Sequence, residues 1–153
     1  MGHTAASCRQ LAVRARRHVD ERRQRFDADV QRGRELTREF VVACGTGDLH
    51  GLRRLLAEDV VVWTDGGGKV RAAPRPVVGA YRSSRFLVHV SKKAVGVPRE
   101  ISLNAQPGMV FIDGDRVASA LVLDFREHKV VGVRVVSNPD KLEWLGAHLG
   151  EPA

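Results

Sequence analysis

The sequence has few cysteines, no long apolar run and no lysine among its first 38 residues. Cys8 and Cys44 are the only cysteines, and their spacing fits neither a disulfide framework nor a metal site. No stretch approaches the roughly 20 apolar residues of a membrane span, and the first residues lack the apolar segment of a secretory signal. These absences predict reduced thiols and a cytoplasmic protein without a metal, a cofactor or a membrane partner.

The length and composition predict one globular domain with an appendage. The 153 residues are 43% hydrophobic and 28% charged, which is enough to build a core. Between Ser7, a candidate N-cap, and Arg34 the only helix-breaking residue is Gly33, and apolar residues recur on one helical face. We therefore expect an N-terminal helix and linker over residues 1–34, followed by a compact domain over residues 35–150.

The net charge of +7 is concentrated near the N-terminus. Residues 1–38 contain ten arginines and five acidic residues, which leaves a net charge of +2 for the other 115 residues. An arginine-rich helix is a candidate for binding phosphates, and a solvated helix face is the alternative. A non-specific nucleic-acid binder that acts through this helix would show steep salt dependence without sequence preference.

The residues after position 35 carry alternating helix and strand patterns. Helices are expected over 35–44, 48–56, 77–90 and 143–149. Asp48 is expected to cap the second of these helices, and the last is expected to bury Trp144 and Leu145. Strands are expected over 60–64, 100–105, 109–112, 116–125 and 130–136, with turns at residues 106–108 and 113–115. This order predicts an α+β fold, in which helices pack on a curved, mostly antiparallel sheet that encloses a cone-shaped cavity.

A run of three glycines follows the apolar strand that ends near Trp63. The segment is Asp65-Gly66-Gly67-Gly68-Lys69, and each glycine is free to adopt a positive φ. Taken alone, such a run is typical of a plain hairpin turn. The opposite charges at its two ends give the loop two groups that can make directional contacts.

Two motifs together resemble a known family. The glycine segment and Asn138-Pro139-Asp140-Lys141-Leu142 resemble the motifs of one subgroup of extracytoplasmic-function (ECF) sigma factors, which carry a SnoaL-like, ketosteroid-isomerase-like cone domain at the C-terminus. Asp48-Leu49 before a leucine-rich helix and the segment from Asn104 to Gly108 fit the same cone pattern. The resemblance covers residues 5–149.

The resemblance implies a regulatory domain whose partners are the sigma domains and core RNA polymerase. The two motifs are then expected to lie side by side as a docking face. Its residues are Asp65, Gly66, Gly67, Gly68, Lys69, Asn138, Pro139, Asp140, Lys141 and Leu142. Glycines without side chains would let another backbone approach closely, and the flanking charges would reach the partner.

The N-terminal helix resembles the last helix of the sigma region that reads the −35 promoter element. The resemblance implies DNA contacts from Arg9, Gln10, Arg14, Arg16 and Arg17. A recognition helix needs its partner helix to be held in the groove, and this sequence contains neither that helix nor a polymerase-binding domain. Promoter DNA is therefore expected as a partner only in a full-length sigma factor. This chain resembles the C-terminal portion of such a protein.

A free-standing enzyme of the isomerase or cyclase type is the alternative. Such an enzyme would use a carboxylate or a histidine in the cavity as a general base. The candidate groups are His89, Asp113, Asp124, His128 and Arg134. Asp113 and His128 lie in predicted turns and His89 ends a predicted helix, whereas Asp124 and Arg134 are expected to form a structural cross-strand ion pair. No catalytic residue is assigned.

Six apolar residues are candidates to line a pocket in the cone. They are Trp63, Tyr81, Phe86, Met109, Phe111 and Leu123. A pocket with few polar groups would take a small apolar ligand that tunes docking, and simple filling of the core is the alternative. A homodimer, formed through the sheet or the arginine-rich helix, is a further candidate partner.

Overall fold

A computed structural model describes residues 5–149 of the chain. The chain divides into two compact units, Met1–Arg32 and Gly33–Ala153, and each is described by itself. In the first unit the described residues belong to helix α1 (Ala5–Thr46). Several large apolar side chains of this unit are open to solvent, since Leu11, Val19 and Phe26 are 52%, 62% and 56% exposed. No helix of residues 5–149 combines the length and apolar character needed to cross a membrane.

The helix boundary predicted near residue 35 is wrong, because α1 continues from Ala5 to Thr46, whereas the domain boundary predicted between residues 34 and 35 stays a prediction. Ser7 therefore lies inside the helix and is not its N-cap. Gly33 is buried in the second unit, and a Cβ atom at this position would lie 2.8 Å from Cγ of Pro107. The Thr37 hydroxyl also donates to the Gly33 carbonyl at 2.7 Å. The glycine thus allows a close approach to Pro107 and does not end the helix.

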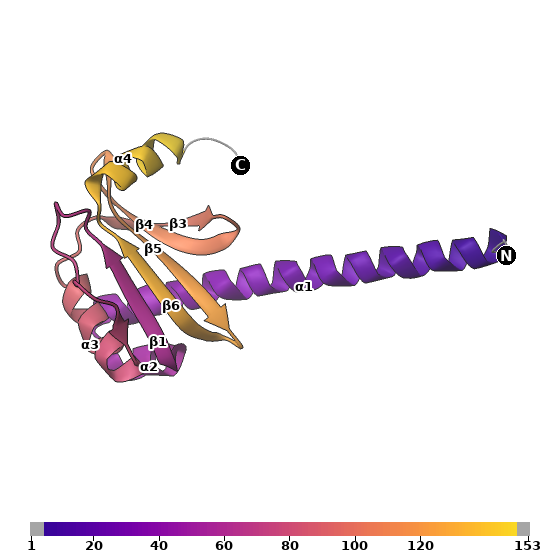
Figure 1. The fold of residues 1–153 in the computed structure, drawn as a ribbon, viewed down its shortest axis with the longest axis horizontal. Coiled ribbons are helices and arrows are strands. Elements are labelled where there is room, and N and C mark those ends of the chain that lie inside the picture. Colours follow the sequence, from indigo (N-terminus) through magenta and orange to yellow (C-terminus); the bar gives the residue numbers. More distant parts are fainter. Residues whose placement is uncertain (1–4, 150–153) are drawn as a thin grey trace. The chain divides into compact units, whose positions relative to one another are not determined.

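The second unit is built on one six-stranded sheet (Figure 1). Its strands are β1 (Leu56–Asp65), β2 (Val77–Val78), β3 (Val97–Leu103), β4 (Gln106–Asp113), β5 (Arg116–Arg126) and β6 (Lys129–Val136). Their order in the sheet is β2-β1-β6-β5-β4-β3. The β1–β6 pair is parallel, and the other neighbours are antiparallel. The sheet is therefore mixed and mostly antiparallel, as the sequence predicts.

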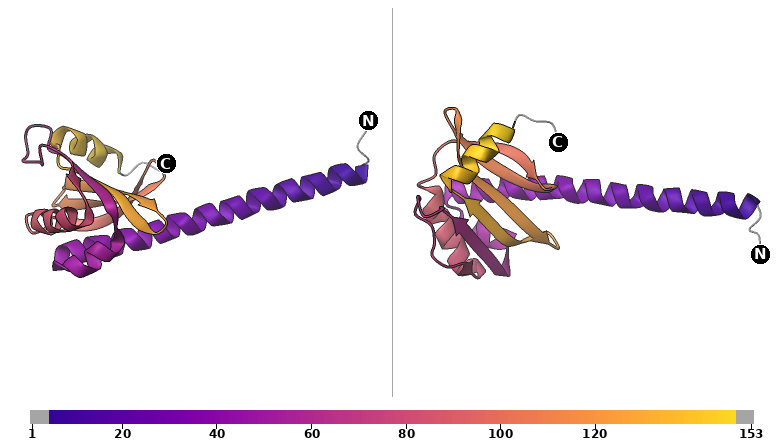
Figure 2. Two further views of the ribbon diagram at one scale, coloured as in Figure 1. Left: turned by 60° about the horizontal axis from the view of Figure 1, so that its bottom comes forward. Right: turned by 45° about the horizontal axis from the view of Figure 1, so that its top comes forward.

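Helices cover both faces of this sheet, as the views in Figure 2 show. The end of α1, α2 (Leu49–Leu55) and α3 (Ala80–Ser91) pack on one face. The main core lies there and includes Phe40, Leu52, Val62, Leu123 and Val133. Helix α4 (Pro139–His148) packs on the other face, where Leu142 meets Val110 and Ala120. Since side chains alternate along a strand, β4, β5 and β6 contribute to both cores.

The predicted turn at residues 106–108 is wrong. The β3–β4 turn lies at Asn104 and Ala105, whose φ angles are 50° and 63°, and β4 already begins at Gln106. Pro107 precedes Gly108, the first residue of β4 that pairs with β5, so its missing N–H removes no bond to that strand. The turn at residues 113–115 is confirmed, because Asp113 pairs with Arg116 across Gly114 and Asp115.

Two predicted helices begin at other residues in the structure. Val77 and Val78 form β2, and α3 begins at Ala80 after Gly79 with a φ of 92°. Helix α4 begins at Pro139 because Asn138 caps it, with Oδ1 accepting from the Asp140 backbone N–H at 3.2 Å. Trp144 is 63% exposed, so its predicted burial is wrong. The predicted cap of α2 is confirmed, since Asp48 Oδ1 accepts from the Gly51 N–H at 2.8 Å.

Candidate functional site

The two motifs of the predicted docking face lie side by side. Lys69 Nζ is 2.8 Å from Asp140 Oδ1, and Lys141 Nζ is 2.6 Å from Asp65 Oδ2. The first and last residues of the glycine loop thus each pair with the first turn of α4, although about 70 positions separate them in the chain. The backbone joins the same segments, because the Ser137 N–H donates to the Asp65 carbonyl at 2.8 Å. The expected juxtaposition of the motifs is confirmed.

The glycines fix the shape of the loop between these pairs. Asp65 Oδ1 accepts from the Gly67 N–H at 2.9 Å, and Gly66 O accepts from the N–H groups of Lys69 and Val70. A Cβ atom on Gly66 would lie 1.9 Å from the Val70 carbonyl oxygen. Gly67 and Gly68 have φ angles of +62° and +71°, which favour glycine. A Cβ atom on Gly67 would meet the Asn138 side chain at 2.4 Å, whereas one on Gly68 would meet open space.

The charged side chains of the two motifs pair with each other, and their expected contacts with a partner stay a prediction. The four side chains remain between 35% and 68% exposed, so each pair is reachable by solvent. The Asp65 carboxylate accepts hydrogen bonds from the Lys141 ammonium group and from the Gly67 N–H. These bonds hold the pKa of Asp65 below its ordinary value of 3.8. Because the pKa is lowered on folding, this stabilisation is present above pH 3.8 and is lost as the pH falls through the lowered value.

The Lys69–Asp140 pair is expected to contribute only modestly to stability. In a double-mutant cycle of Lys69→Ala and Asp140→Ala we expect a coupling energy of about 0.5 kcal/mol at low salt, because exposed pairs typically give 0.2–1 kcal/mol. In 1 M salt the coupling should disappear through screening. Urea denaturation of the four proteins at both salt concentrations measures it. A coupling that is absent at low salt would show that the contact does not hold the loop on α4.

The candidate catalytic groups do not gather in the cone. Asp124 and Arg134 form the predicted ion pair, with Arg134 NH1 2.6 Å from Asp124 Oδ2. Gln106 Nε2 donates to the other carboxylate oxygen at 2.7 Å, and Arg134 stacks on the Trp63 ring. Since Leu123 points into the main core, its neighbour Asp124 lies on the opposite face of the sheet.

The other three groups lie at the surface. Asp113 pairs with Arg116 at 3.2 Å beside the β4–β5 turn. His128 is exposed in the β5–β6 turn with a φ of 64°, and His89 is exposed near the end of α3. The expectations of turn positions for Asp113 and His128 are therefore confirmed, and none of the three is enclosed.

The six predicted pocket residues are divided between core and surface. Met109 and Leu123 are buried in the main core, and Phe86 and Phe111 pack against it. Trp63 and Tyr81 are 40% and 58% exposed. The predicted apolar ligand site stays a prediction.

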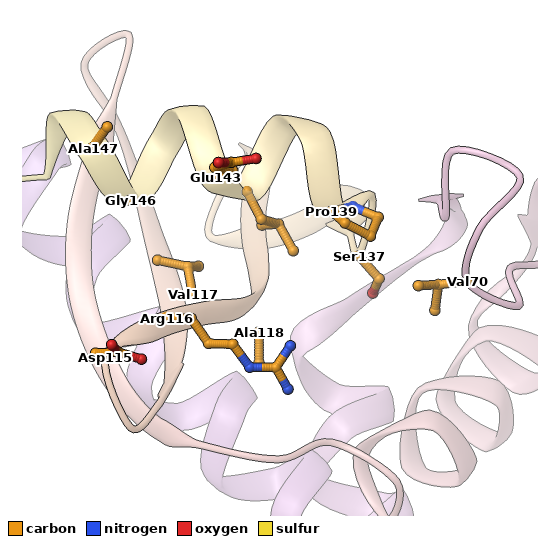
Figure 3. Close-up of a pocket in the computed structure, with 11 residues that line it drawn as sticks. Val70, Asp115, Arg116, Val117, Ala118, Ser137, Pro139, Glu143, Gly146 and Ala147 are labelled. Atoms are coloured by element: carbon orange, nitrogen blue, oxygen red, sulfur yellow. The ribbon is translucent and has the colours of Figure 1, made fainter.

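A different cavity lies between α4 and the start of β5, and its volume is about 370 Å³ (Figure 3). It is lined by Val70, Asp115, Arg116, Val117, Ala118, Ser137, Pro139, Leu142, Glu143, Gly146 and Ala147. None of the six predicted residues is among these. The cavity shares Pro139 and Leu142 with the predicted docking face.

The predicted DNA-contacting residues lie on the exposed surface of α1 in the first unit. Arg9 Nε donates to the Ala5 carbonyl at 3.3 Å, and Arg17 pairs with Glu21 at 3.1 Å. Gln10, Arg14 and Arg16 are exposed. DNA contacts of this helix stay a prediction.

Both cysteines are free thiols. Cys8 is exposed and Cys44 is buried, and burial raises the pKa of the Cys44 thiol to about 12. Within residues 5–149 no cluster of three His, Cys, Asp or Glu side chains is arranged to hold a metal ion.

The fold is similar to that of NTF2-like proteins. No family model matches the sequence. The crystal structure of an NTF2-like protein from Burkholderia xenovorans covers 74% of this chain and 95% of its own, with a TM-score of 0.54 and 17% identity. The predicted α+β cone fold is confirmed by this similarity and by the mixed sheet.

The chain is homologous to ECF sigma factors. The Mycobacterium tuberculosis protein described as "Probable ECF RNA polymerase sigma factor SigI" is 32% identical over 151 residues, which cover 98% of this chain and 50% of SigI. SigJ of the same species is 28% identical over 163 residues, which cover 99% of this chain and 52% of SigJ. The SigJ crystal structure covers 95% of this chain and 52% of its own, with a TM-score of 0.58 and 26% identity. The chain spans about half the length of the curated relatives that it matches.

One basic cluster of the second unit was not predicted. It comprises Arg53 and Arg54 of α2 and Arg82 and Arg85 of α3, with Tyr81 between them, and all five side chains are exposed. The sequence does contain a signal for it. From Gly66 to Arg99 there are eight lysines and arginines and no aspartate or glutamate. This run is hidden in the net charge of +2 for residues 39–153, because acidic residues elsewhere offset it.

Proposed function

We propose that this chain is the regulatory portion of an ECF-type sigma factor of the subgroup that carries both motifs. In this assignment residues 35–150 are the SnoaL-like regulatory domain, and residues 1–34 are the remnant of the promoter-reading helix with its linker. The support is the homology to SigI and SigJ over nearly the whole chain. The domain modulates transcription initiation in the cytoplasm through contacts with sigma domains and core RNA polymerase.

The docking face is the part of the domain that makes these contacts. The observation that carries this proposal is the crossed pairing of Lys69 with Asp140 and of Asp65 with Lys141, which joins the two motifs into one surface. The pairs keep the loop in place and leave Gly68 open, with nothing within 4 Å of a Cβ atom at that position. A partner backbone can therefore approach the loop at Gly68 without displacing a side chain.

Other partners follow from the same assignment. Promoter DNA is contacted by the N-terminal helix only when the remaining sigma domains are present. A small apolar ligand that tunes docking and a homodimer are also part of the proposal. The cavity beside Pro139 and Leu142 supports the ligand, because an occupant would touch the docking face directly.

Transcription reconstituted from separate parts tests the proposal. The chain is titrated into mycobacterial core RNA polymerase and the part of SigI that lies outside the match, and run-off transcripts from a SigI-dependent promoter are quantified. We expect the chain to change the transcript yield by about 5-fold or more, which is the lower range of typical coupling between sites. No change at tens of micromolar chain would contradict a regulatory role.

A matched pair of variants tests the docking face. Gly68→Asn places a side chain in the open space of the loop, and asparagine tolerates the positive φ. Gly114→Asn is the control, because Gly114 has a φ of +66° and the same open surroundings in the β4–β5 turn. The half-effect concentration should rise about 10-fold for Gly68→Asn and stay unchanged for Gly114→Asn. Equal behaviour of the two variants would exclude the loop as the contact.

A further inference from the structure

The surface of α2 and α3 carries positive charge without acidic residues. Helix α2 has the sequence LHGLRRL, and α3 has the sequence AYRSSRFLVHVS. Together they contain Arg53, Arg54, Arg82 and Arg85 and no aspartate or glutamate. Lys92 and Lys93 follow α3 and are also exposed. We call the four arginines together with Tyr81 the arginine cluster.

Tyr81 connects the arginines of the two helices. The guanidinium carbon of Arg53 lies 4.8 Å from the centre of the Tyr81 ring, and that of Arg85 lies 5.7 Å from it. Arg53 Nε also donates to Ser84 Oγ at 3.4 Å, and Arg85 NH1 donates to the Tyr81 hydroxyl at 3.3 Å. Arg82 and Arg85 are three positions apart and hence neighbours on the surface of α3. The cluster is therefore one continuous surface.

None of these four arginines has a carboxylate partner among the described residues. Elsewhere in the second unit, in contrast, arginines pair with acids, as in Arg116–Asp113, Arg126–Asp59 and Arg134–Asp124. A group of like charges without counter-charges repels itself and attracts anions. The cluster thus lacks the internal neutralisation that these three pairs have, and it can attract an anionic partner.

We propose that the arginine cluster binds the phosphate backbone of nucleic acid. DNA offers a dense row of charges, about one per 1.7 Å of duplex axis, and the planar guanidinium fork fits phosphate oxygens. Tyr81 is 58% exposed and lies beside two guanidinium groups, and an exposed aromatic ring among cations is typical of surfaces that bind nucleic acid. This aromatic group favours nucleic acid over an acidic protein surface. The contacts are to phosphates, so they carry no sequence preference.

The cluster is separate from the docking face. Helix α4 packs on one face of the sheet, and α2 and α3 pack on the other face (Figures 1 and 2). Nucleic acid on the cluster therefore leaves the loop over Asp65–Lys69 accessible. The domain can hold nucleic acid and a protein partner at the same time.

Fluorescence anisotropy with a labelled 20-nucleotide DNA, single- or double-stranded, tests the proposal across a series of salt concentrations. The test variant is Arg53→Gln/Arg82→Gln/Arg85→Gln in the full chain. The control is Arg99→Gln/Arg116→Gln/Arg126→Gln, which removes the same charge outside the cluster. Both keep the arginines of the first unit, so the difference between them reports on the cluster alone. We expect the test variant to bind about 10-fold or more weakly at 50 mM salt and to lose about 2 to 3 from the slope of log K against log salt.

Three outcomes would overturn the proposal. Equal losses in the test and control variants would mean that only total charge matters. Competition by poly-glutamate as effective as by DNA of equal charge would assign the cluster to an acidic protein. If circular dichroism shows that the test variant does not fold, the single change Arg82→Glu replaces it, because Arg82 is exposed. An unchanged affinity of Arg82→Glu would then overturn the proposal, and a weakening of about 10-fold supports it.

Discussion

Replacing Phe40 with alanine is expected to lower the free energy of unfolding by about 3–5 kcal/mol. Phe40 is 1% exposed and belongs to the main core with Leu52, Val62 and Leu123. The change removes a large side chain from a site that α1, the sheet and α2 enclose, and the cavity cannot close without moving these elements. Urea denaturation followed by far-UV circular dichroism and tryptophan fluorescence measures the loss.

Phe26→Ala is the matched control for this prediction, because both phenylalanines belong to α1. Phe26 is 56% exposed in the first unit, and its truncation should change the free energy of unfolding by no more than about 0.5 kcal/mol. Comparable losses for the two variants would contradict the assignment of Phe40 to the core and of Phe26 to an open surface.

The second large effect is expected for Gly67→Ala, at about 2–3 kcal/mol. A left-handed conformation costs a residue with a Cβ atom about 1–2 kcal/mol, and the φ of Gly67 is +62°. The new methyl group would also displace the Asn138 side chain, which lies within 2.6 Å of the Cβ position and caps α4. Loss of such a cap costs about 1 kcal/mol. The same denaturation experiment detects the change.

Gly68→Ala separates the two contributions. Its φ of +71° gives the same backbone cost, but a Cβ atom there meets no neighbour within 4 Å. We expect a loss of about 1–2 kcal/mol, smaller than that of Gly67→Ala by the energy of the cap. If the two variants lose the same amount, Asn138 does not depend on the glycine that faces it.

The fold was predictable because hydrophobic patterns and turn residues agree over most of the chain. Asp48 caps α2, and Gly114 lies in the turn between β4 and β5. In both cases the local sequence pattern alone predicts the structure. Pro107 misled the prediction for the opposite reason. A proline before a glycine is a strong turn pattern, but here the sheet places Pro107 within a strand, at a point where no N–H is needed toward β5. The predicted start of the last helix at residue 143 missed its first turn, because the Asn138 side chain caps α4 and the helix begins at Pro139.

The site was predictable only in part. The two motifs were expected to meet because of the family resemblance, and the structure brings them together. The pairing of their charges with each other was not expected, because the sequence does not reveal which lysine faces which aspartate. The arginine cluster was overlooked because a net charge averages over the chain. Its members come from two helices that only the folded chain brings together around Tyr81.

The distance in sequence between the two halves of the docking face has a consequence for recognition. Asp65–Lys69 and Asn138–Leu142 are joined by β6 and β1, which pair in parallel, and by the two lysine–aspartate contacts. The surface is therefore a discontinuous epitope that no peptide of either segment reproduces. It forms only after β1 and β6, the first and last strands in the sequence, have paired. A partner that binds both segments thus reads the folded state of the domain and ignores chains that are still unfolded or incompletely synthesised.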